Sequence, residues 1–200
     1  MKIGLIVECC DGGAETKVIP HVARLIRPAA VPVVVPLRSK RLLKANCGPA
    51  AKALMEKSGC QRVLILWDLL PDFNEYEGRG CRRSDKEEIA ASLKSAGVSP
   101  TDARVQVVCI EKMLESWVLA DNLAVAGLLS TPEHPVHVPK CKHPDDVRDP
   151  EAALNRSFRE TRFRKYRDLD HAFKIIESAD LTRLRRSESF RRFEAKLATG

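Results

Sequence analysis

The chain has 200 residues, of which 44% are hydrophobic, and carries a formal net charge of +7 at pH 7. This length and composition suit one α/β domain, or a domain of about 130 residues with a helical appendix, and exclude a disordered chain. No stretch approaches the ~18 apolar residues of a membrane-spanning helix, and the N-terminus lacks a signal-peptide pattern. We therefore expect a cytoplasmic protein without a membrane partner, whose seven cysteines are reduced thiols.

The first predicted strand is an apolar run that ends at an acid, residues 3–7 followed by Glu8. An uninterrupted apolar run is typical of a buried central strand in a parallel sheet. Apolar residues at helical spacing then predict a helix over 14–26. Residues 31–36 are β-branched and bracketed by prolines, which predicts a short strand near the edge of the sheet. A second helix is predicted over 48–58.

The middle of the chain repeats this pattern. An apolar strand over 62–68 again delivers an acid at its last residue. A helix over 84–96 follows, with Ser84 as its N-cap and an acid three residues later completing a capping box. A strand over 104–110 and a helix over 113–129 come next.

This alternation of strands and helices predicts an α/β fold with a mainly parallel sheet flanked by helices. Residues 1–130 are expected to form the α/β domain, and residues 131–200 a loop and a basic helical tail that packs on it. In the tail, Leu169, Phe173 and Ile176 are expected to share one apolar helix face, and Ser187 to start the last helix.

Acidic residues follow three of the predicted strands. Glu8 ends the first and Asp68 a later one, with Asp72 close behind, whereas Glu111 and Glu115 follow the last. The carboxyl ends of parallel strands meet at the sheet edge where α/β proteins bind ligands. Carboxylate oxygens suit Mg²⁺ or Mn²⁺, with waters and phosphates as the remaining ligands. The acids therefore predict a metal site, or a proton-transfer role for Glu8; the alternative is ordinary polar residues where strands meet loops.

Basic residues concentrate near the C-terminus. Thirteen Lys and Arg against seven Asp and Glu lie between 156 and 196, so this segment carries +6 of the net charge of +7. Such asymmetry predicts contact with a polyanion, DNA or RNA, although a solvated helical surface would show the same pattern. The candidate phosphate-binding residues are Arg82, Arg83, Arg162, Arg164, Lys165 and Arg191.

Several stretches carry a family resemblance: residues 3–15, 64–72, 111–121, 166–176 and 186–193. The most specific is the run Glu-Ser-Trp-Val-Leu-Ala-Asp that ends at Asp121. Over most of its length the chain resembles the Toprim-like bacterial proteins grouped as domain-of-unknown-function family 4276. The Toprim fold is shared by primases, topoisomerases and overcoming-lysogenization-type nucleases.

The resemblance implies a first-strand Glu as general acid/base and an Asp-x-Asp after a later strand that holds Mg²⁺. On this sequence the catalytic residues would be Glu8 and Asp68, and the metal ligands Glu8 and Asp68 with Asp72 or Glu115. The implied activity is a metal-dependent phosphodiester hydrolase, a nuclease acting on nucleic acid in a bacterial defence or mobile-element module.

The alternative is a non-catalytic Toprim-like module that binds nucleic acid or a companion ATPase. Two departures from the family pattern weaken the implied roles: Cys9 stands where the usual Gly follows the glutamate, and Leu70 stands where the second Asp falls. The missing second Asp favours the non-catalytic module. The oligomeric state is left open by the sequence.

Overall fold

Four parallel strands form the centre of the protein. The structure is a computed structural model that describes residues 1–70 and 81–198. Its sheet has the order β2-β1-β3-β4, with every neighbouring pair parallel. The strands are β1 (Lys2–Val7), β2 (Val31–Pro36), β3 (Arg62–Asp68) and β4 (Val105–Ile110). The predicted parallel α/β fold is confirmed, and so is the edge position of β2.

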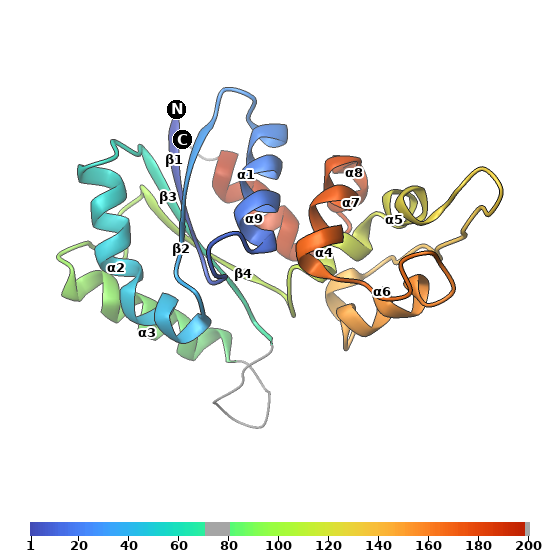
Figure 1. The fold of residues 1–200 in the computed structure, drawn as a ribbon. Helices are drawn as coiled ribbons and strands as arrows, with labels where there is room; N and C mark the ends of the chain where they lie inside the picture. Colours follow the sequence, from blue (N-terminus) through green and yellow to red (C-terminus); the bar gives the residue numbers. More distant parts are fainter. Residues whose placement is uncertain (71–80, 199–200) are drawn as a thin grey trace.

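Helices cover both faces of this sheet (Figure 1). On one face lie α2 (Lys40–Glu56) and α3 (Arg82–Ser95), which pack against each other, and α2 contacts β1 and β3. On the other face lie α1 (Ala14–Ile26) and α9 (Glu188–Ala198). Side chains alternate between two hydrophobic clusters along each strand, because successive strand residues point to opposite faces.

The remaining helices form a group beside the carboxyl ends of the strands (Figure 1). They are α4 (Glu115–Ala120), α5 (Asn122–Leu129), the 3-10 turn η2 (Pro144–Asp146), α6 (Pro150–Phe158), the π-helical turn η3 (Asp168–Ala172), α7 (Phe173–Glu177) and α8 (Leu181–Leu184). No helix in the two described ranges is long and apolar enough to cross a membrane.

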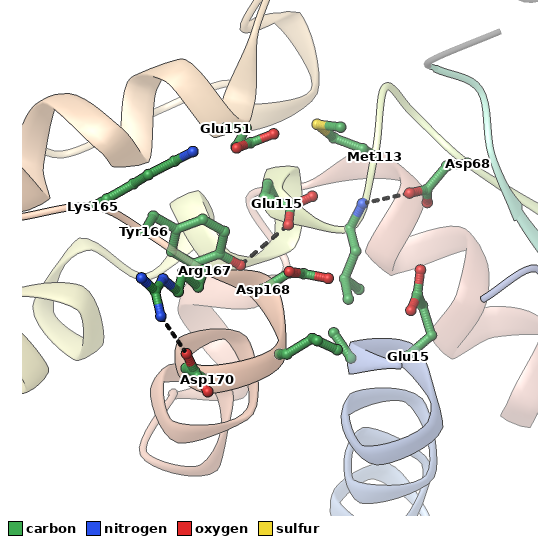
Figure 2. Close-up of a pocket in the computed structure, with 13 residues that line it drawn as sticks. Glu15, Asp68, Met113, Glu115, Glu151, Lys165, Tyr166, Arg167, Asp168 and Asp170 are labelled. Carbon is green, nitrogen blue, oxygen red and sulfur yellow. Dashed lines mark hydrogen bonds and ion pairs between the residues drawn. The ribbon is translucent and has the colours of Figure 1, made fainter. Parts of the chain in front are cut away.

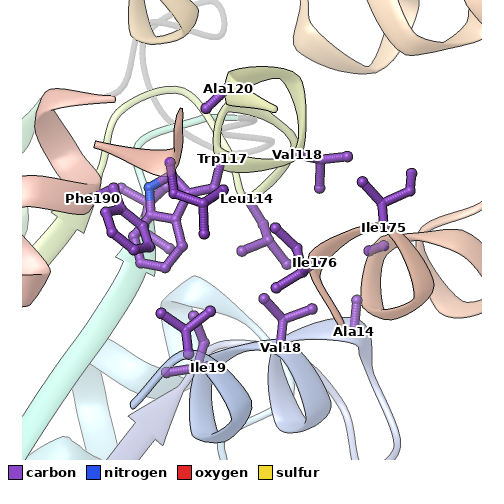
Figure 3. Packing of buried hydrophobic residues seen from close by; sticks show 14 of the residues in the cluster. Ala14, Val18, Ile19, Leu114, Trp117, Val118, Ala120, Ile175, Ile176 and Phe190 are labelled. Carbon is purple, nitrogen blue, oxygen red and sulfur yellow. The ribbon is translucent and has the colours of Figure 1, made fainter. Parts of the chain in front are cut away.

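The helical group and the sheet share one hydrophobic core (Figure 3). Trp117 of α4 is fully buried, and its ring lies 5.1 Å from that of Phe190 and 5.4 Å from that of Phe193, both in α9. Its indole Nε1 donates a hydrogen bond to Ser189 Oγ at 2.9 Å. This packing fixes the C-terminal helix, and with it the basic segment, against α4 and the sheet.

The structure corrects the predicted single helix over 113–129, which is two helices. Asp121 leaves helical geometry, with φ −109° and ψ 83°, and its carboxylate accepts hydrogen bonds from the amides of Leu123 and Ala124 at 3.1 Å. The same carboxylate accepts from Arg183 Nε at 2.8 Å. A buried acid that caps α5 and binds a distant arginine therefore interrupts the helix.

Two predicted helix starts are also wrong. Helix α3 begins at Arg82, so Ser84 lies inside the first turn and forms no capping box. The N-cap of α3 is Cys81, whose side chain makes no capping hydrogen bond. Helix α2 begins at Lys40 instead of 48, with the Ser39 hydroxyl accepting from the amide of Leu42.

In the tail, Leu169 is 54% exposed and does not join the buried face of Phe173 and Ile176, because it lies in the π-helical turn before α7. The prediction for Ser187 is confirmed, since its hydroxyl accepts from the amide of Phe190 at 3.0 Å, at the start of α9.

Candidate functional site

The strand order creates a crevice between β1 and β3. The chain leaves β1 to form β2 on one side and returns to form β3 on the other, so the connections diverge between these two strands. In open α/β sheets, ligands bind beyond the carboxyl ends of the strands at such a switch point. Glu8 directly follows β1 and Asp68 is the last residue of β3, so both acids lie at this position.

Glu8 and Asp68 are in direct contact. The backbone amide of Asp68 donates a hydrogen bond to Glu8 Oε2 at 3.2 Å. The Asp68 carboxylate in turn accepts from the amide of Leu114 at 3.2 Å, which ties it to the segment after β4. Asp68 is only 8% exposed. The carboxylates of two neighbouring central strands are thus held in place by backbone amides.

Both groups resist ionisation. Burial raises the pKa of Glu8 from 4.5 to about 8, although the Asp68 amide favours the charged form. Burial also raises the pKa of Asp68 well above its ordinary range, and the charges of Glu8, Glu15 and Glu115 raise it further. Perturbed carboxyl groups in a crevice are typical of functional sites.

A cavity of about 650 Å³ opens beside Asp68 (Figure 2). Six acids line it: Glu15 in the first turn of α1, Asp68, Glu115 at the start of α4, Glu151 in α6, and Asp168 and Asp170 in η3. Burial raises the pKa of Glu15, and Asp168 adds to the shift through its charge. The cavity therefore concentrates negative charge where the helical group meets the sheet edge.

Glu115 and Tyr166 form the inner wall of this cavity. Glu115 is 7% exposed, and the Tyr166 hydroxyl donates to its Oε1 at 3.2 Å, as Figure 2 shows. Burial raises the pKa of Glu115 to about 7, while the bond from Tyr166 opposes that rise. Tyr166 is itself held by an edge-on contact with Phe158, at 5.5 Å between ring centroids. A carboxyl group that titrates near neutral pH thus faces the cavity in a fixed orientation.

The predicted site residues omitted most of the residues that line this cavity, among them Glu15, Tyr166 and Asp168. Glu15 had a sequence signal, since it lies in the first turn of the helix that follows the Gly12-Gly13 loop. The sequence around Tyr166 reads as part of a basic tail, so nothing local indicated contact with Glu115, 51 residues earlier.

The donor chemistry of Glu8 and Asp68 fits a hard cation. Mg²⁺ is commonly held by one or two carboxylates, with waters and substrate phosphates completing its shell. Within residues 1–70 and 81–198, no group of three or more His, Cys, Asp or Glu is arranged to hold a metal ion. The residues that would hold Mg²⁺ are therefore the pair Glu8 and Asp68. The predicted ligand Asp72 lies outside the described residues, and Glu115 lies across the cavity with Tyr166 as its partner.

The structure disperses the predicted phosphate-binding residues. Arg82 pairs with Glu111, which also binds Arg192 at 3.0 Å, and Arg83 pairs with Glu87 on the exposed surface of α3. Of the six, only Lys165 lines the cavity of Asp68 and Glu115. Arg162 Cζ lies 4.8 Å above the Phe163 ring, whereas Arg164 and Arg191 are exposed.

Several arginines of the basic tail are used in packing. Arg183 binds the buried Asp121, Arg185 binds Glu194 in a bidentate pair, and Arg186 donates to the carbonyl of Ala120. Part of the positive charge between 156 and 196 is therefore neutralised inside the protein.

Comparison with known proteins identifies a family without an assigned activity. The model of a domain of unknown function, DUF4276, matches residues 11–198. No curated protein and no solved structure matches the chain.

Proposed function

Because this chain belongs to the DUF4276 family, whose description gives no activity, we propose from the site itself that it is a Mg²⁺-dependent phosphodiester hydrolase acting on nucleic acid. One observation carries the proposal: the half-buried Glu8 and the buried Asp68 lie side by side at the carboxyl ends of the central strands, with the Asp68 amide bonded to the Glu8 carboxylate. Carboxylates that are crowded and desolvated in this way gain most from a divalent cation.

The proposed roles follow from the contacts of each group. Asp68 is oriented by the Leu114 amide and would hold the metal together with Glu8. When bound, Mg²⁺ would polarise a phosphoryl oxygen of the substrate. Glu8, with its pKa near 8, can also accept or donate a proton at neutral pH. Lys165 reaches the cavity from the opposite wall, where its ammonium can pair with a phosphate oxygen.

A relation to Toprim domains is part of this proposal. It is supported by the parallel sheet, by the Glu after its first strand and by the Asp at the end of its third. Cys9 and Leu70 depart from the Toprim pattern at two positions beside these acids. Burial and the neighbouring Glu15 raise the pKa of the Cys9 thiol, so this residue lies beside the acidic site as a neutral group in place of a glycine.

A non-catalytic module that binds nucleic acid or a companion ATPase is the second candidate. Leu70 at the position of the second Asp favours it, as does the lack of a three-carboxylate group in the described ranges. The two candidate functions predict different outcomes for cleavage of nucleic acid and for metal binding, and these two properties can be measured separately.

The test of catalysis uses single-stranded and duplex DNA and RNA oligonucleotides with Mg²⁺ or Mn²⁺. We expect cleavage by the wild type and a loss of at least about 100-fold for Glu8→Gln and for Asp68→Asn. Glu177→Gln, a change of the same kind at an exposed residue of α7, should retain full activity. Cleavage that survives both site substitutions would contradict the assignment.

Metal binding is tested without substrate by Mn²⁺ electron paramagnetic resonance and by thermal unfolding. At 100 times its dissociation constant, a bound metal stabilises the folded state by about 2.7 kcal/mol. We expect this stabilisation in the wild type and in Glu177→Gln, and its loss in Asp68→Asn. Oligonucleotide binding without metal binding or cleavage would support the non-catalytic module.

A further inference from the structure

A second cavity lies on the outer side of α1, away from the carboxylate crevice. It has a volume of about 320 Å³, is open to solvent on its outer side and is bordered by α1, the edge strand β2 and Phe173 of α7. Ligand pockets for small molecules begin at about 300 Å³. The cavity is therefore large enough for one small molecule.

The charge of this cavity is opposite to that of the first. Lys17 and Arg24, two turns apart on α1, border it, and no acidic side chain lines it. Val18 and Ile19 of the same helix point into the hydrophobic core, as Figure 3 shows, so the basic residues occupy the outward face. Neither Lys17 nor Arg24 has a side-chain ion pair with a described residue, which leaves both cations available to an anion.

His21 lies between these two cations and has an unused polar atom. Its Nε2 is buried and has no hydrogen-bond partner among the described residues. The ring is fixed edge-on against Phe173, with 5.4 Å between centroids and 81° between planes. Buried polar atoms in folded proteins are nearly always paired, so this exception calls for an explanation such as an ordered water or ion behind the ring.

The rest of the lining is mostly apolar; its one other polar residue, Thr16, donates its hydroxyl to the carbonyl of Gly13. Pro20 of α1 is buried and lines the cavity on the helix side. Pro32 and Val34 of β2 line it on the sheet side. The rings of the two prolines and of Phe173 give flat surfaces with little conformational entropy to lose on binding. A ligand with both an anionic end and a flat apolar body would satisfy all parts of this lining.

We propose that this cavity binds a small phosphate-bearing molecule with a flat apolar body, such as a nucleoside monophosphate. The phosphate lies between Lys17 and Arg24, where the guanidinium can bind two of its oxygens. The flat body lies on Pro20, Pro32 and Phe173, beside the His21 ring. A polymeric strand is disfavoured because the cavity has room for one small molecule.

The test titrates the wild-type protein with adenosine monophosphate, following the His21 imidazole by NMR and the heat of binding by calorimetry. Glycerol phosphate serves as a probe with the phosphate but without the flat body. Arg24→Gln is compared with Lys52→Gln, which removes one exposed cation from α2 on the opposite face of the sheet.

We expect adenosine monophosphate to shift the His21 signals and to bind at least tenfold more tightly than glycerol phosphate. Arg24→Gln should weaken its binding about tenfold, the effect of losing one charge-assisted contact, and Lys52→Gln should leave it unchanged. Equal weakening by the two substitutions would overturn the site. Equal affinity for the two probes would overturn the role of the apolar lining. Displacement of the nucleotide from His21 by an oligonucleotide of higher affinity would overturn the preference for a small ligand.

Discussion

The backbone amide of Asp68 donates a hydrogen bond to the carboxylate of Glu8, at 3.2 Å from nitrogen to Oε2. This bond links the ends of β1 and β3, the two central strands of the sheet. It stabilises the charged form of Glu8, yet burial of the carboxyl group outweighs it, and the pKa of Glu8 is still raised to about 8. The fold thus holds Glu8 close to Asp68 at a cost in stability that grows as the pH rises above about 4.5.

This cost predicts a pH dependence of stability. With its pKa near 4.5 in the unfolded chain and near 8 in the folded one, Glu8 binds more protons when folded between these values. Stability therefore falls as the pH rises from about 4.5 to 8 and is lowest above 8. Glu8→Gln removes this loss, so its melting temperature should exceed that of the wild type increasingly from pH 5 to pH 9.

The measurement is thermal unfolding in buffers that contain a chelator, so that no divalent cation neutralises the acids. Glu177→Gln controls for the removal of one surface charge. A constant difference in melting temperature between wild type and Glu8→Gln across this pH range would contradict the raised pKa.

Removing the Tyr166 hydroxyl should change the titration of Glu115. The hydroxyl stabilises the charged carboxylate, so Tyr166→Phe should raise the pKa of Glu115 above its value of about 7. The ring is retained and keeps its contact with Phe158, and the loss in stability should be about 1 to 3 kcal/mol. Carbon-13 NMR of the Glu115 carboxyl group measures the pKa; an unchanged or lower value would show that the hydrogen bond does not form in solution.

The buried Asp85 should be essential for stability. It is 1% exposed and accepts from Trp67 Nε1 at 2.9 Å, and its oxygens lie 3.3 Å from Lys44 Nζ and 3.1 Å from Lys40 Nζ. Asp85→Asn leaves two ammonium groups without this charge and should cost about 3 to 5 kcal/mol in urea unfolding.

Glu88→Gln is the matched control for Asp85→Asn. Glu88 binds the same Lys44 at 2.9 Å, but its side chain is 45% exposed, so the change should cost under about 1 kcal/mol. Similar losses of stability for Asp85→Asn and Glu88→Gln would show that the burial of Asp85 does not strengthen its contribution to stability.

Helices α2 and α3 should not tolerate a side chain at Gly48. A Cβ there would collide with the backbone carbonyl of Ser92, and the Gly48 amide donates to Ser92 Oγ at 3.0 Å. Gly48→Ala should therefore lower the free energy of unfolding by about 3 kcal/mol or prevent folding, because the backbones of α2 and α3 must move apart.

Gly127→Ala provides the comparison in a helix where a Cβ would meet nothing within 4 Å. Alanine has the higher helix propensity, so this change should stabilise the protein by about 0.5 to 1 kcal/mol. Circular dichroism during urea unfolding measures the stability of both variants. Equal changes in the free energy of unfolding for Gly48→Ala and Gly127→Ala would contradict the close approach of α2 and α3.

Local patterns in the sequence were sufficient for the sheet. The apolar runs that end at Glu8 and Asp68 predicted buried parallel strands, because strands covered on both faces need no polar alternation. The prolines of β2 predicted its edge position, since proline cannot donate a ladder hydrogen bond. The placement of acids at one sheet edge follows from the same strand geometry.

The helix boundaries and most of the site required the tertiary structure. Asp121 interrupts a continuous helical pattern because it binds Arg183, 62 residues later, and local propensity contains no such information. Tyr166 reaches Glu115 only because the chain after α6 folds back over the sheet edge.

The sequence by itself determined which acids stand at the strand ends, because strand length and periodicity are local properties. Only the tertiary structure decided that Asp68 and Glu115 are buried beside one cavity, with Glu8 bonded to the Asp68 amide. Desolvation and repulsion by nearby carboxylates, which raise the pKa values of all three acids, depend on groups that are distant in the chain and adjacent in space.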